Sequence, residues 1–370
     1  MRNIFRQAKG HLISLDQDGA GIAETADQAV AALNRGEVMA FPTDTVYGLG
    51  CRADLHQAVK RVYRLKGRNF SKPLILFIKD PKELTGLVRQ APEYAGKLIE
   101  AYWPGPLTMV FPASDQVRRW GLDKNGTIGI RIPNHQALLS ILDKLDFPLA
   151  TTSANASGSQ ESCNVQQVME SFKDPVDLIL DGGMLPRCRP STVLDLSREL
   201  PVILRRGDIG REELSDLLQL PVKQDKVEVL FVCTGNTCRS PMAEGYLKHI
   251  LPKNWKDRVN VRSCGTRALP GMPATDKGQE TARKCGFELS GHHSRTLTDS
   301  LIKQSDIIIA LEEGHRQDVL KLHPRAQVAL LAVDGVADPI GGTLDDYGRT
   351  LELIKREMPD VLEKIKEILA

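Results

Sequence analysis

A cysteine and an arginine six positions apart stand in a segment whose residue types suit phosphoryl transfer. The segment runs from Cys233 to Pro241, reads Cys-Thr-Gly-Asn-Thr-Cys-Arg-Ser-Pro, follows an apolar run and precedes a helical pattern. Backbone amides at a helix start converge on anions, and the same field favours a Cys233 thiolate with a pKa of about 3.5–7.5. Arg239 offers a planar fork that matches two phosphate oxygens. The pattern predicts displacement at phosphorus through a phosphocysteine.

The other positions of this segment are expected to bind the phosphate or its carrier. They are Thr234, Gly235, Asn236, Thr237, Cys238 and Ser240. Gly235 permits unusual backbone angles, and the Ser240 hydroxyl is expected to hydrogen-bond the sulfur or the departing group. Cys238 is either a packed thiol or the partner of a reversible disulfide that protects the nucleophile from over-oxidation.

The displacement needs a general acid for the leaving group and then a base that activates water. Asp338 is the candidate, because it lies in the Gly- and Pro-rich stretch Val336–Gly342 ahead of a long helical pattern. An Asp-Pro pair alone is equally typical of a plain turn, so this assignment depends on the cysteine segment.

Three polar segments in the first half suit a small-molecule pocket. Residues 41–50 and 151–158 place hydroxyls and turn residues directly after apolar stretches, and residues 65–74 gather cations between a helical and a strand pattern. These cations are Lys66, Arg68 and Lys72. Guanidinium and ammonium groups in such a setting could hold a triphosphate, whereas each segment alone is typical of a capped turn or a solvated charge cluster.

Strand and helix patterns must position these segments. The first part alternates the two, with one helical stretch expected over residues 81–103, which predicts a mixed α/β domain with many strands. From Val227 on, strands and helices alternate regularly, which predicts a doubly wound parallel sheet whose site lies beyond the carboxyl ends of its strands. The stretch Leu220–Lys226 reads as a linker, so we expect α/β domains over residues 1–222 and 226–370.

Composition narrows the class of protein. The chain has 370 residues, 41% of them hydrophobic, and its 49 Lys and Arg against 47 Asp and Glu leave a net charge of +2. Such a balance disfavours a dominant nucleic-acid-binding stripe. We find no apolar run of the roughly 18 residues that a membrane span needs and no hydrophobic export signal at the polar start. Seven scattered cysteines do not form a disulfide framework, so we expect a cytoplasmic chain with mostly buried thiols.

The second half resembles the low-molecular-weight phosphatases. The stretches FVCTGNTCRSPMAE and ADPIGGTLDDY carry the resemblance, which covers about residues 226–370. It implies Cys233 as nucleophile, Arg239 as phosphate binder and Asp338 as acid and base. It also implies phosphorylated proteins as substrates and requires neither a metal nor a cofactor.

The substrate class depends on a few positions. Thr237 and the Gly-Gly pair that follows Asp-Pro-x resemble the bacterial protein-arginine phosphatases, since tyrosine phosphatases of the family usually carry a bulky aliphatic residue at the Thr237 position. A polar side chain there can hydrogen-bond a guanidinium, with which Asp338 would also pair. Ile340 departs from the arginine-phosphatase pattern, which tends to have an aromatic residue. We expect phosphoarginine, with phosphotyrosine as the alternative. Arsenate reduction is disfavoured because only Cys264 and Cys285 follow, far apart in sequence.

The first half resembles the threonylcarbamoyl-adenylate synthases, which contain a YrdC-type domain. PTDTVYGLG, KGRNFSKPL, WPGPLT, RIP, TTSANASG, STVLDL and LRRG occur in this order within about residues 20–220. The resemblance implies one twisted mixed α/β domain with a concave, positively lined cavity. It implies synthesis of threonylcarbamoyl-adenylate from L-threonine, bicarbonate and ATP, with Mg²⁺ accompanying ATP. The product would feed tRNA modification through partner proteins.

The same resemblance implies roles for individual residues. ATP contacts are implied for Lys66, Arg68, Lys72, Thr108, Ser153, Asn155, Ser191 and Arg205, and threonine contacts for Thr45, Arg131 and Thr192. Asn69 stands where many members have Pro after the arginine. An RNA-binding module is the alternative for this domain, although few aromatic residues are available for base stacking.

Overall fold

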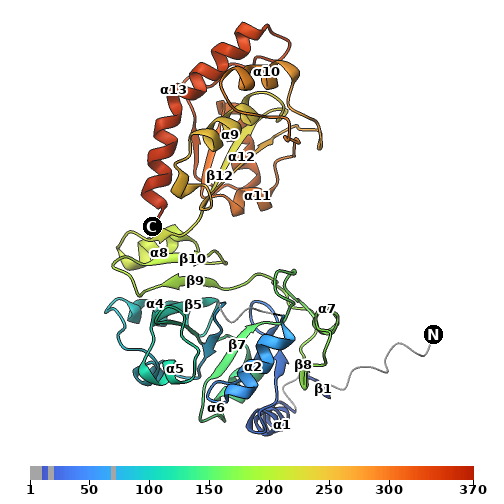
Figure 1. Cartoon of the computed structure of the whole chain (residues 1–370), viewed down its shortest axis with the longest axis vertical. Helices are drawn as coiled ribbons and strands as arrows, with labels where there is room; N and C mark the ends of the chain where they lie inside the picture. Colours follow the sequence, from blue (N-terminus) through green and yellow to red (C-terminus); the bar gives the residue numbers. More distant parts are fainter. Residues whose placement is uncertain (1–10, 16–20, 68–71) are drawn as a thin grey trace, which may run out of the picture. The chain divides into compact units, whose positions relative to one another are not determined.

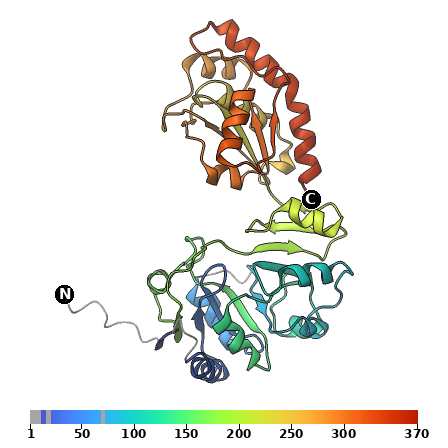
Figure 2. The ribbon, with the colours of Figure 1, turned by 180° about the vertical axis from the view of Figure 1, so that it is seen from behind.

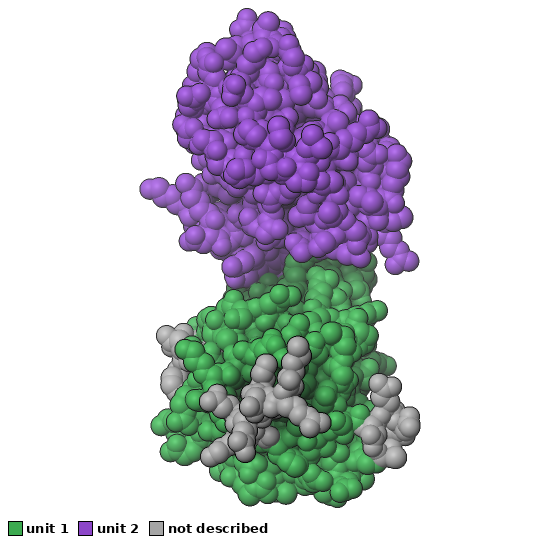
Figure 3. Space-filling model, turned by 90° about the vertical axis from the view of Figure 1, so that its right-hand side faces the viewer, with its two compact units in different colours: residues 1–222 green, residues 223–370 purple. Residues whose placement is uncertain are grey.

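The computed structural model describes residues 11–15, 21–67 and 72–370. It separates into two compact units, Met1–Val222 and Lys223–Ala370, which Figure 3 shows in different colours. Among the described residues, no helix combines the length and the apolar character that crossing a bilayer requires.

The first unit mixes parallel and antiparallel strands, as expected from the sequence (Figure 1). Its strands are β1 (His11–Ser14), β2 (Met39–Phe41), β3 (Gly48–Arg52), β4 (Ile75–Phe77), β5 (Leu107–Pro112), β6 (Thr127–Arg131), β7 (Leu149–Ser153), β8 (Leu178–Asp181), β9 (Thr192–Asp195) and β10 (Val202–Arg205). They lie side by side in the order β1-β8-β2-β3-β7-β4-β6-β5-β9-β10. Its helices are α1 (Ile22–Asn34), α2 (His56–Leu65), α3 (Leu84–Leu87), α4 (Ala95–Tyr102), α5 (Asp115–Arg119), α6 (Gln136–Asp143), α7 (Val165–Ser171) and α8 (Arg211–Leu218), with a 3-10 turn, η1, at Pro81–Glu83.

Alternating side chains bury both faces of this sheet. Met39 and Phe41 of β2 join the apolar cluster formed by α1 and α6, whereas Ala40 joins the larger cluster on the opposite face. Residues two apart on a strand point to the same face, so a short apolar strand can supply two cores at once. The sheet is therefore fixed from both sides, and its strand ends present loops at defined positions.

Two local expectations are wrong. The helix expected over residues 81–103 is broken between α3 and α4, because Val88 pairs with Ala113 in a β-bridge and turns the chain out of the helix. The segment Gly48–Arg52, which reads as turn and loop, forms the strand β3 between β2 and β7. Its glycines fit there because a Cβ at Gly48 would lie 2.5 Å from the Phe41 ring.

The second unit is a parallel sheet with helices on both faces, which confirms the doubly wound expectation. Figure 2 shows the long α13 along one side of this unit. The unit contains β11 (Lys223–Gln224), β12 (Val227–Cys233), β13 (Val259–Gly265), β14 (Ile307–Ala310) and β15 (Val328–Leu330), and the last four form one sheet in the order β13-β12-β14-β15. Its helices are α9 (Arg239–Ile250), α10 (Asp276–Lys284), α11 (Asp299–Gln304), α12 (Glu313–Leu322) and α13 (Leu344–Ile368), with a 3-10 turn, η2, at Lys253–Trp255.

The central strand β12 positions the cysteine segment. Val229, Phe231 and Cys233 share a core with α9 and α13, whereas Leu230 and Val232 share the opposite core with α12. This alternation places the Cys233 side chain on the α9 face at the carboxyl end of the strand.

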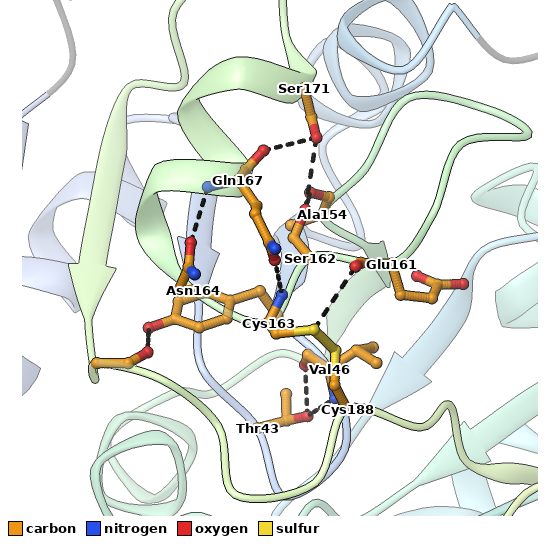
Figure 4. The surroundings of a disulfide bond; sticks show 12 residues. Thr43, Val46, Ala154, Glu161, Ser162, Cys163, Asn164, Gln167, Ser171 and Cys188 are labelled. Atoms are coloured by element: carbon orange, nitrogen blue, oxygen red, sulfur yellow. Dashed lines mark hydrogen bonds between the residues drawn. A yellow bond between two sulfur atoms is a disulfide. The ribbon is translucent and has the colours of Figure 1, made fainter.

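Most of the cysteines are buried thiols, as expected, but one pair is bonded. Cys163 and Cys188 form a disulfide between two irregular segments, with their Cα atoms 5.4 Å apart (Figure 4). The two residues lie 25 positions apart in sequence, and only the fold brings them together. The other cysteines are free thiols, and of these Cys285 is partly exposed while the rest are buried.

Candidate active sites

The cysteine loop connects the end of β12 to the start of α9. The Cys233 sulfur lies 2.9 Å from the Ser240 hydroxyl oxygen and accepts a hydrogen bond from the backbone amide of Asn236 at 3.2 Å. The Cys233 residue is only 2% exposed. Polar donors therefore meet a buried sulfur at the end of a strand, which suits a nucleophile held in one position.

Burial changes the electrostatics expected for this sulfur. Burial raises the pKa of the Cys233 thiol, while hydrogen bonds from Ser240 and Asn236 and the charge of Arg239 oppose that rise. The direction of this shift is opposite to the lowering that we expect from the helix start alone. The physical reason is that the loop encloses the sulfur, whereas an exposed helix terminus leaves a thiolate hydrated.

Asn236 has a structural role in the cysteine loop, because its side chain bonds neighbouring residues and is not exposed at the site. The residue is fully buried, and its side-chain amide donates to the hydroxyls of Ser240 and Ser263 at 2.9 and 2.8 Å. Its side-chain oxygen accepts from the Arg295 amide, and its carbonyl lies 2.7 Å from the His292 ring nitrogen. Four neighbours thus hold one side chain and its peptide group, so the loop is rigid without a ligand.

The unusual backbone angle also falls on Asn236. Its φ is 54°, in the left-handed region that asparagine tolerates better than most residues. Gly235, which was expected to supply such an angle, is not among the positive-φ glycines. Thr237 follows, half-buried, and the Cys238 sulfur packs 3.3 Å from the Tyr347 hydroxyl oxygen.

Arg239 joins three parts of this site. One of its terminal nitrogens donates to Glu312 and the other to Asp338, both at 2.6 Å, and the second also reaches the Thr234 hydroxyl at 3.1 Å. The Arg239 side chain is 2% exposed, and its Nε has no hydrogen-bond partner among the residues that the structure describes. The structure thus brings Cys233, Arg239 and Asp338, the three expected catalytic residues, to one end of the sheet.

Sequence reasoning missed Glu312 and His315. Glu312 lies between β14 and α12, and its carboxylate meets both Arg239 and, at 3.2 Å, the His315 ring. The same ring nitrogen lies 2.8 Å from the Thr234 hydroxyl, and burial lowers the pKa of His315. Neither residue belongs to a contiguous motif, so only the parallel strand order reveals their proximity to the loop.

Gly265 is a further position that sequence reasoning missed. It ends β13, beside the cysteine loop, where a Cβ atom would lie 2.4 Å from the Thr234 carbonyl oxygen and 2.9 Å from the Asn236 amide. Real side chains do not approach backbone this closely, so any larger residue must displace the loop.

The first unit contains a cavity of about 540 Å³ over its sheet. Among the residues expected to bind ATP or threonine, its walls include Thr45, Thr108, Arg131, Ser153, Ser191 and Arg205. They come from the loop after β2 and from β5, β6, β7, β9 and β10 or their ends. A cavity of this size with hydroxyls and the three guanidinium groups of Arg131, Arg198 and Arg205 suits a phosphorylated small molecule.

Arg131 is held on the floor of this cavity. It donates to the Gly105 carbonyl, the Thr45 hydroxyl and the Asp44 carboxylate at 2.8, 2.9 and 2.6 Å. Burial lowers the pKa of Arg131, and the Asp44 charge opposes that shift. Asp44 was not singled out from the sequence, although it lies within the Thr43-Asp44-Thr45 run that the resemblance covers.

Ser191 links two strands at the cavity wall. Its hydroxyl lies 2.8 Å from that of Thr108 and accepts from Arg205 at 3.0 Å. Thr192 points elsewhere, because its hydroxyl donates to the Ile209 carbonyl and accepts from the Gly207 amide. Ser191 therefore belongs to the cavity and Thr192 to its support.

The expected phosphate-binding lysines lie beside the cavity. Lys66 is buried, and its ammonium donates to the backbone and hydroxyl of Ser153 and to Asn155. The Asn155 amide closes its own loop onto the Ser159 carbonyl. Lys72 is exposed and reaches the Ser157 hydroxyl at 3.4 Å. Lys66 and Asn155 thus fix the loop that carries Ser153. Arg68 and Asn69 lie outside the described residues.

Each half of the chain matches a family of known proteins. Residues 31–207 match the Sua5/YciO/YrdC family model, whose description is telomere recombination. A threonylcarbamoyl-AMP synthase from Rattus norvegicus is 37% identical over 211 residues, which cover 54% of this chain and 72% of that protein. The chain belongs to the threonylcarbamoyl-AMP synthase family. A synthase from Pyrococcus abyssi is 39% identical over 193 residues, 51% of this chain.

The synthase relatives differ from this chain in length. The matched part spans 56% of the P. abyssi synthase and 58% of one from Bacillus subtilis. The solved structure of P. abyssi Sua5 complexed with L-threonine has the same fold, with a TM-score of 0.53 at 22% identity, and covers 94% of this chain and 96% of its own. Residues 228–369 match the low molecular weight phosphotyrosine protein phosphatase family model. The chain thus joins a threonylcarbamoyl-AMP synthase domain to a second domain that matches the low molecular weight phosphotyrosine protein phosphatase family model.

Proposed function

We propose that the first unit makes threonylcarbamoyl-adenylate from L-threonine, bicarbonate and ATP. The observation that carries this proposal is the 540 Å³ cavity in which Thr45, Arg131 and Arg205 converge. Arg131 and Thr45 suit the carboxylate of threonine, since a buried guanidinium pairs well with that group. Ser153, Ser191 and Arg205 suit the nucleotide, and the product would pass to partner proteins that modify tRNA.

The reaction needs placement more than covalent help. The threonine amine and bicarbonate form a carbamate as water leaves, and the carbamate oxygen attacks the α-phosphorus of ATP while the bond to pyrophosphate breaks. Cations and hydroxyls that hold both reactants in line supply the effective concentration and neutralise the departing charge. Mg²⁺ bound through substrate phosphates is the common arrangement in such sites, and we treat it as part of the nucleotide substrate.

Pyrophosphate release tests this proposal. We expect release that depends on both L-threonine and bicarbonate, and we expect Arg205→Ala to lower it at least tenfold by removing a cation worth about 1.5–3 kcal/mol in a charged hydrogen bond. Arg35→Ala is the matched control, because Arg35 pairs with Glu37 on the surface and does not line the cavity. RNA retention without pyrophosphate release would instead support the RNA-binding module.

We further propose that the second unit is a phosphatase that uses Cys233. The sulfur attacks phosphorus, the bond to the leaving group breaks, and Asp338 gives that group a proton. Water then attacks the phosphocysteine, the Asp338 carboxylate takes its proton, and phosphate and the thiolate separate. Arg239 and the loop amides stabilise the phosphoryl oxygens during both steps.

Phosphoarginine on proteins is the substrate that we favour. Asp338 and Glu312, with side chains 35% and 44% exposed, both bind Arg239, so two carboxylates share one buried cation near the loop. A second cation from a substrate guanidinium would complete this charge balance, whereas a phenol would not. Thr237 places a hydroxyl in the loop, which can hydrogen-bond the guanidinium of the substrate.

Matched phosphoarginine and phosphotyrosine peptides distinguish the two substrate classes. We expect a higher kcat/KM for phosphoarginine, and we expect Thr237→Ile to shift the ratio at least tenfold towards phosphotyrosine. Cys233→Ser should abolish turnover of both peptides while pyrophosphate release by the first unit continues. A higher kcat/KM for phosphotyrosine in the unaltered chain would support the tyrosine phosphatase instead.

A further inference from the structure

The disulfide between Cys163 and Cys188, shown in Figure 4, joins two irregular segments, each of which is continuous in sequence with residues that line the synthase cavity. Residues 154–164 follow β7 and its cavity residue Ser153, and residues 182–191 connect β8 to β9 and contain the cavity residues Pro190 and Ser191. The bridge therefore connects the segment that follows Ser153 to the segment that leads into Pro190 and Ser191.

The Cys163 end of the bridge is firmly anchored. The Cys163 amide donates to the Gln167 side chain of α7 at 2.7 Å. The preceding residue, Ser162, accepts from the Tyr47 amide through its carbonyl and donates to the Ala154 carbonyl through its hydroxyl. These bonds tie Cys163 to helix, strand and loop whatever the state of its sulfur.

The Cys188 end has much weaker support. The residue is exposed, in a segment without helix or strand. Nearby, the Leu185 amide donates to the Cys163 carbonyl, and Arg187 and Arg189 reach Asp208 at 4.0 and 3.4 Å on the surface. Exposed ion pairs of this kind contribute little. Earlier in the segment, the Tyr47 hydroxyl bonds the backbone of Gly182 and Gly183, and Leu185 is buried in the core. The covalent bridge is thus the main tether of residues 186–190, which lead into Ser191.

We propose that Cys163 and Cys188 form a redox modification site that controls the order of residues 182–191 and, through Ser191, the affinity of the cavity for its nucleotide. A dithiol reductant opens it by thiol–disulfide exchange. A thiolate of the reductant attacks the exposed Cys188 sulfur, the Sγ–Sγ bond breaks, and the Cys163 sulfur leaves and takes a proton. The second thiol of the reductant then releases the Cys188 thiol, so two electrons and two protons have moved and the reductant is oxidised to a disulfide.

Reduction loosens one wall of the cavity without dismantling it. Ser191 keeps its bonds to Thr108 and Arg205 in both states, but three residues before it the chain loses its tether. A lower populated fraction of the binding-competent wall raises the apparent Kd by the same factor. In a reducing compartment, bridges of this kind are typically transient or redox-sensing. The effect on nucleotide affinity rests on the proposed synthase function, whereas the redox site itself does not.

Three measurements on the full chain, oxidised and then treated with dithiothreitol, test the proposal. Mass spectrometry of alkylated peptides reports the bridge, and hydrogen exchange reports residues 182–191. We expect exchange there to rise about tenfold on reduction, since local opening sets this rate. We expect the Kd for ATP to rise about threefold to tenfold.

Variants separate the bridge from other thiols. Cys188→Ser should show the hydrogen exchange and the ATP affinity of the reduced chain, and it should no longer respond to dithiothreitol. Cys163→Ser should behave in the same way and replaces Cys188→Ser if that variant folds poorly. Cys285→Ser is the control, because this partly exposed thiol lies in the second unit and should leave the response intact.

The outcomes distinguish the two proposals. No Cys163–Cys188 peptide in the oxidised chain, or equal exchange of residues 182–191 in both states, overturns the redox site. A bridge that changes exchange but not ATP affinity overturns its control of the cavity. Redox-dependent exchange in a chain that binds no ATP in either state supports the redox site and overturns the synthase proposal.

Discussion

Arg239 Nη2 donates to Asp338 Oδ2 across 2.6 Å, which joins the loop after β12 to the loop before α13. This bond puts the proposed phosphate binder and the proposed acid within one hydrogen bond of each other. A phosphoryl group that binds the Arg239 guanidinium must compete with the Asp338 carboxylate. Phosphate binding is therefore coupled to the breaking of the Arg239–Asp338 hydrogen bond.

Asp338→Asn tests the proposed acid. The amide keeps a hydrogen-bond acceptor for Arg239 but cannot give a proton to the leaving group, so kcat should fall by about 10²–10⁴ with little change in KM. Steady-state kinetics on a phosphorylated peptide measure both constants. Asp334→Asn, at an exposed carboxylate four residues away, should leave kcat unchanged. Equal kcat values for Asp338→Asn and the unaltered chain would exclude Asp338 as the acid.

Gly265→Ala tests the contact between β13 and the cysteine loop. The added Cβ would meet the Thr234 carbonyl oxygen at 2.4 Å, so the loop must shift and the chain should lose about 1–3 kcal/mol of stability. A shift of about 1 Å in the reacting groups costs about 10²-fold in rate, so phosphatase kcat/KM should fall to a similar extent.

Gly291→Ala is the matched control for this substitution. A Cβ at Gly291 meets nothing within 4 Å, so both the unfolding midpoint and kcat/KM should stay close to those of the unaltered chain. Full phosphatase activity of Gly265→Ala would show that the cysteine loop can shift without lowering kcat/KM.

Asp44→Ala tests the buried ion pair of the synthase cavity. The substitution leaves the Arg131 guanidinium, 3% exposed, without its carboxylate. Removing one partner of a buried pair costs about 3–5 kcal/mol, which urea unfolding of the first unit would show. Asp54→Ala breaks a more exposed pair with Arg52 and should cost at most about 1 kcal/mol. Equal losses of unfolding free energy in both variants would show that the Asp44–Arg131 pair stabilises the unit no more than a surface ion pair does.

His292 should make the second unit sensitive to acid. Burial lowers the pKa of His292 from the ordinary 6.5, and its Nε2–H suits donation to the Asn236 carbonyl. Below pH 6.5 the unfolded chain binds a proton that the folded one resists, so stability is complete above that pH and falls as the pH drops below it. Thermal unfolding between pH 8 and pH 5 measures this loss.

His292→Gln should flatten the same profile. The glutamine amide retains a donor for the Asn236 carbonyl but does not titrate. His293→Gln changes the exposed neighbour and should keep the slope of the unaltered chain. Identical slopes in all three proteins would assign the acid sensitivity to another group.

Contiguous motifs predicted where each site lies. Cys233 and Arg239 lie in one segment, and the strand-to-helix context predicted its place at a sheet end, because sequence-local periodicity reports strands and helices directly. The same logic located the hydroxyl loop at Ser153. The strand β3 was missed because its glycines suggest a turn, whereas the Phe41 ring that requires them lies on the neighbouring strand.

Contacts between distant segments escaped prediction for a different reason. Glu312 and His315 reach the cysteine loop only because β14 lies beside β12, and neither residue has a local signature. The sequence predicts Lys66 as a phosphate ligand. In the structure its buried ammonium donates to the Ser153 carbonyl instead, because a buried charged donor must find hydrogen-bond acceptors. The Cys163–Cys188 bridge depends likewise on how two irregular segments meet.

The tight fastening of Asn236 has a thermodynamic consequence for the phosphatase site. Because Ser240, Ser263, Arg295 and His292 already fix this residue, an arriving anion has little conformational entropy left to remove from the loop. Calorimetry of vanadate or phosphate association should therefore show a small heat-capacity change, as expected for a preorganised binding site.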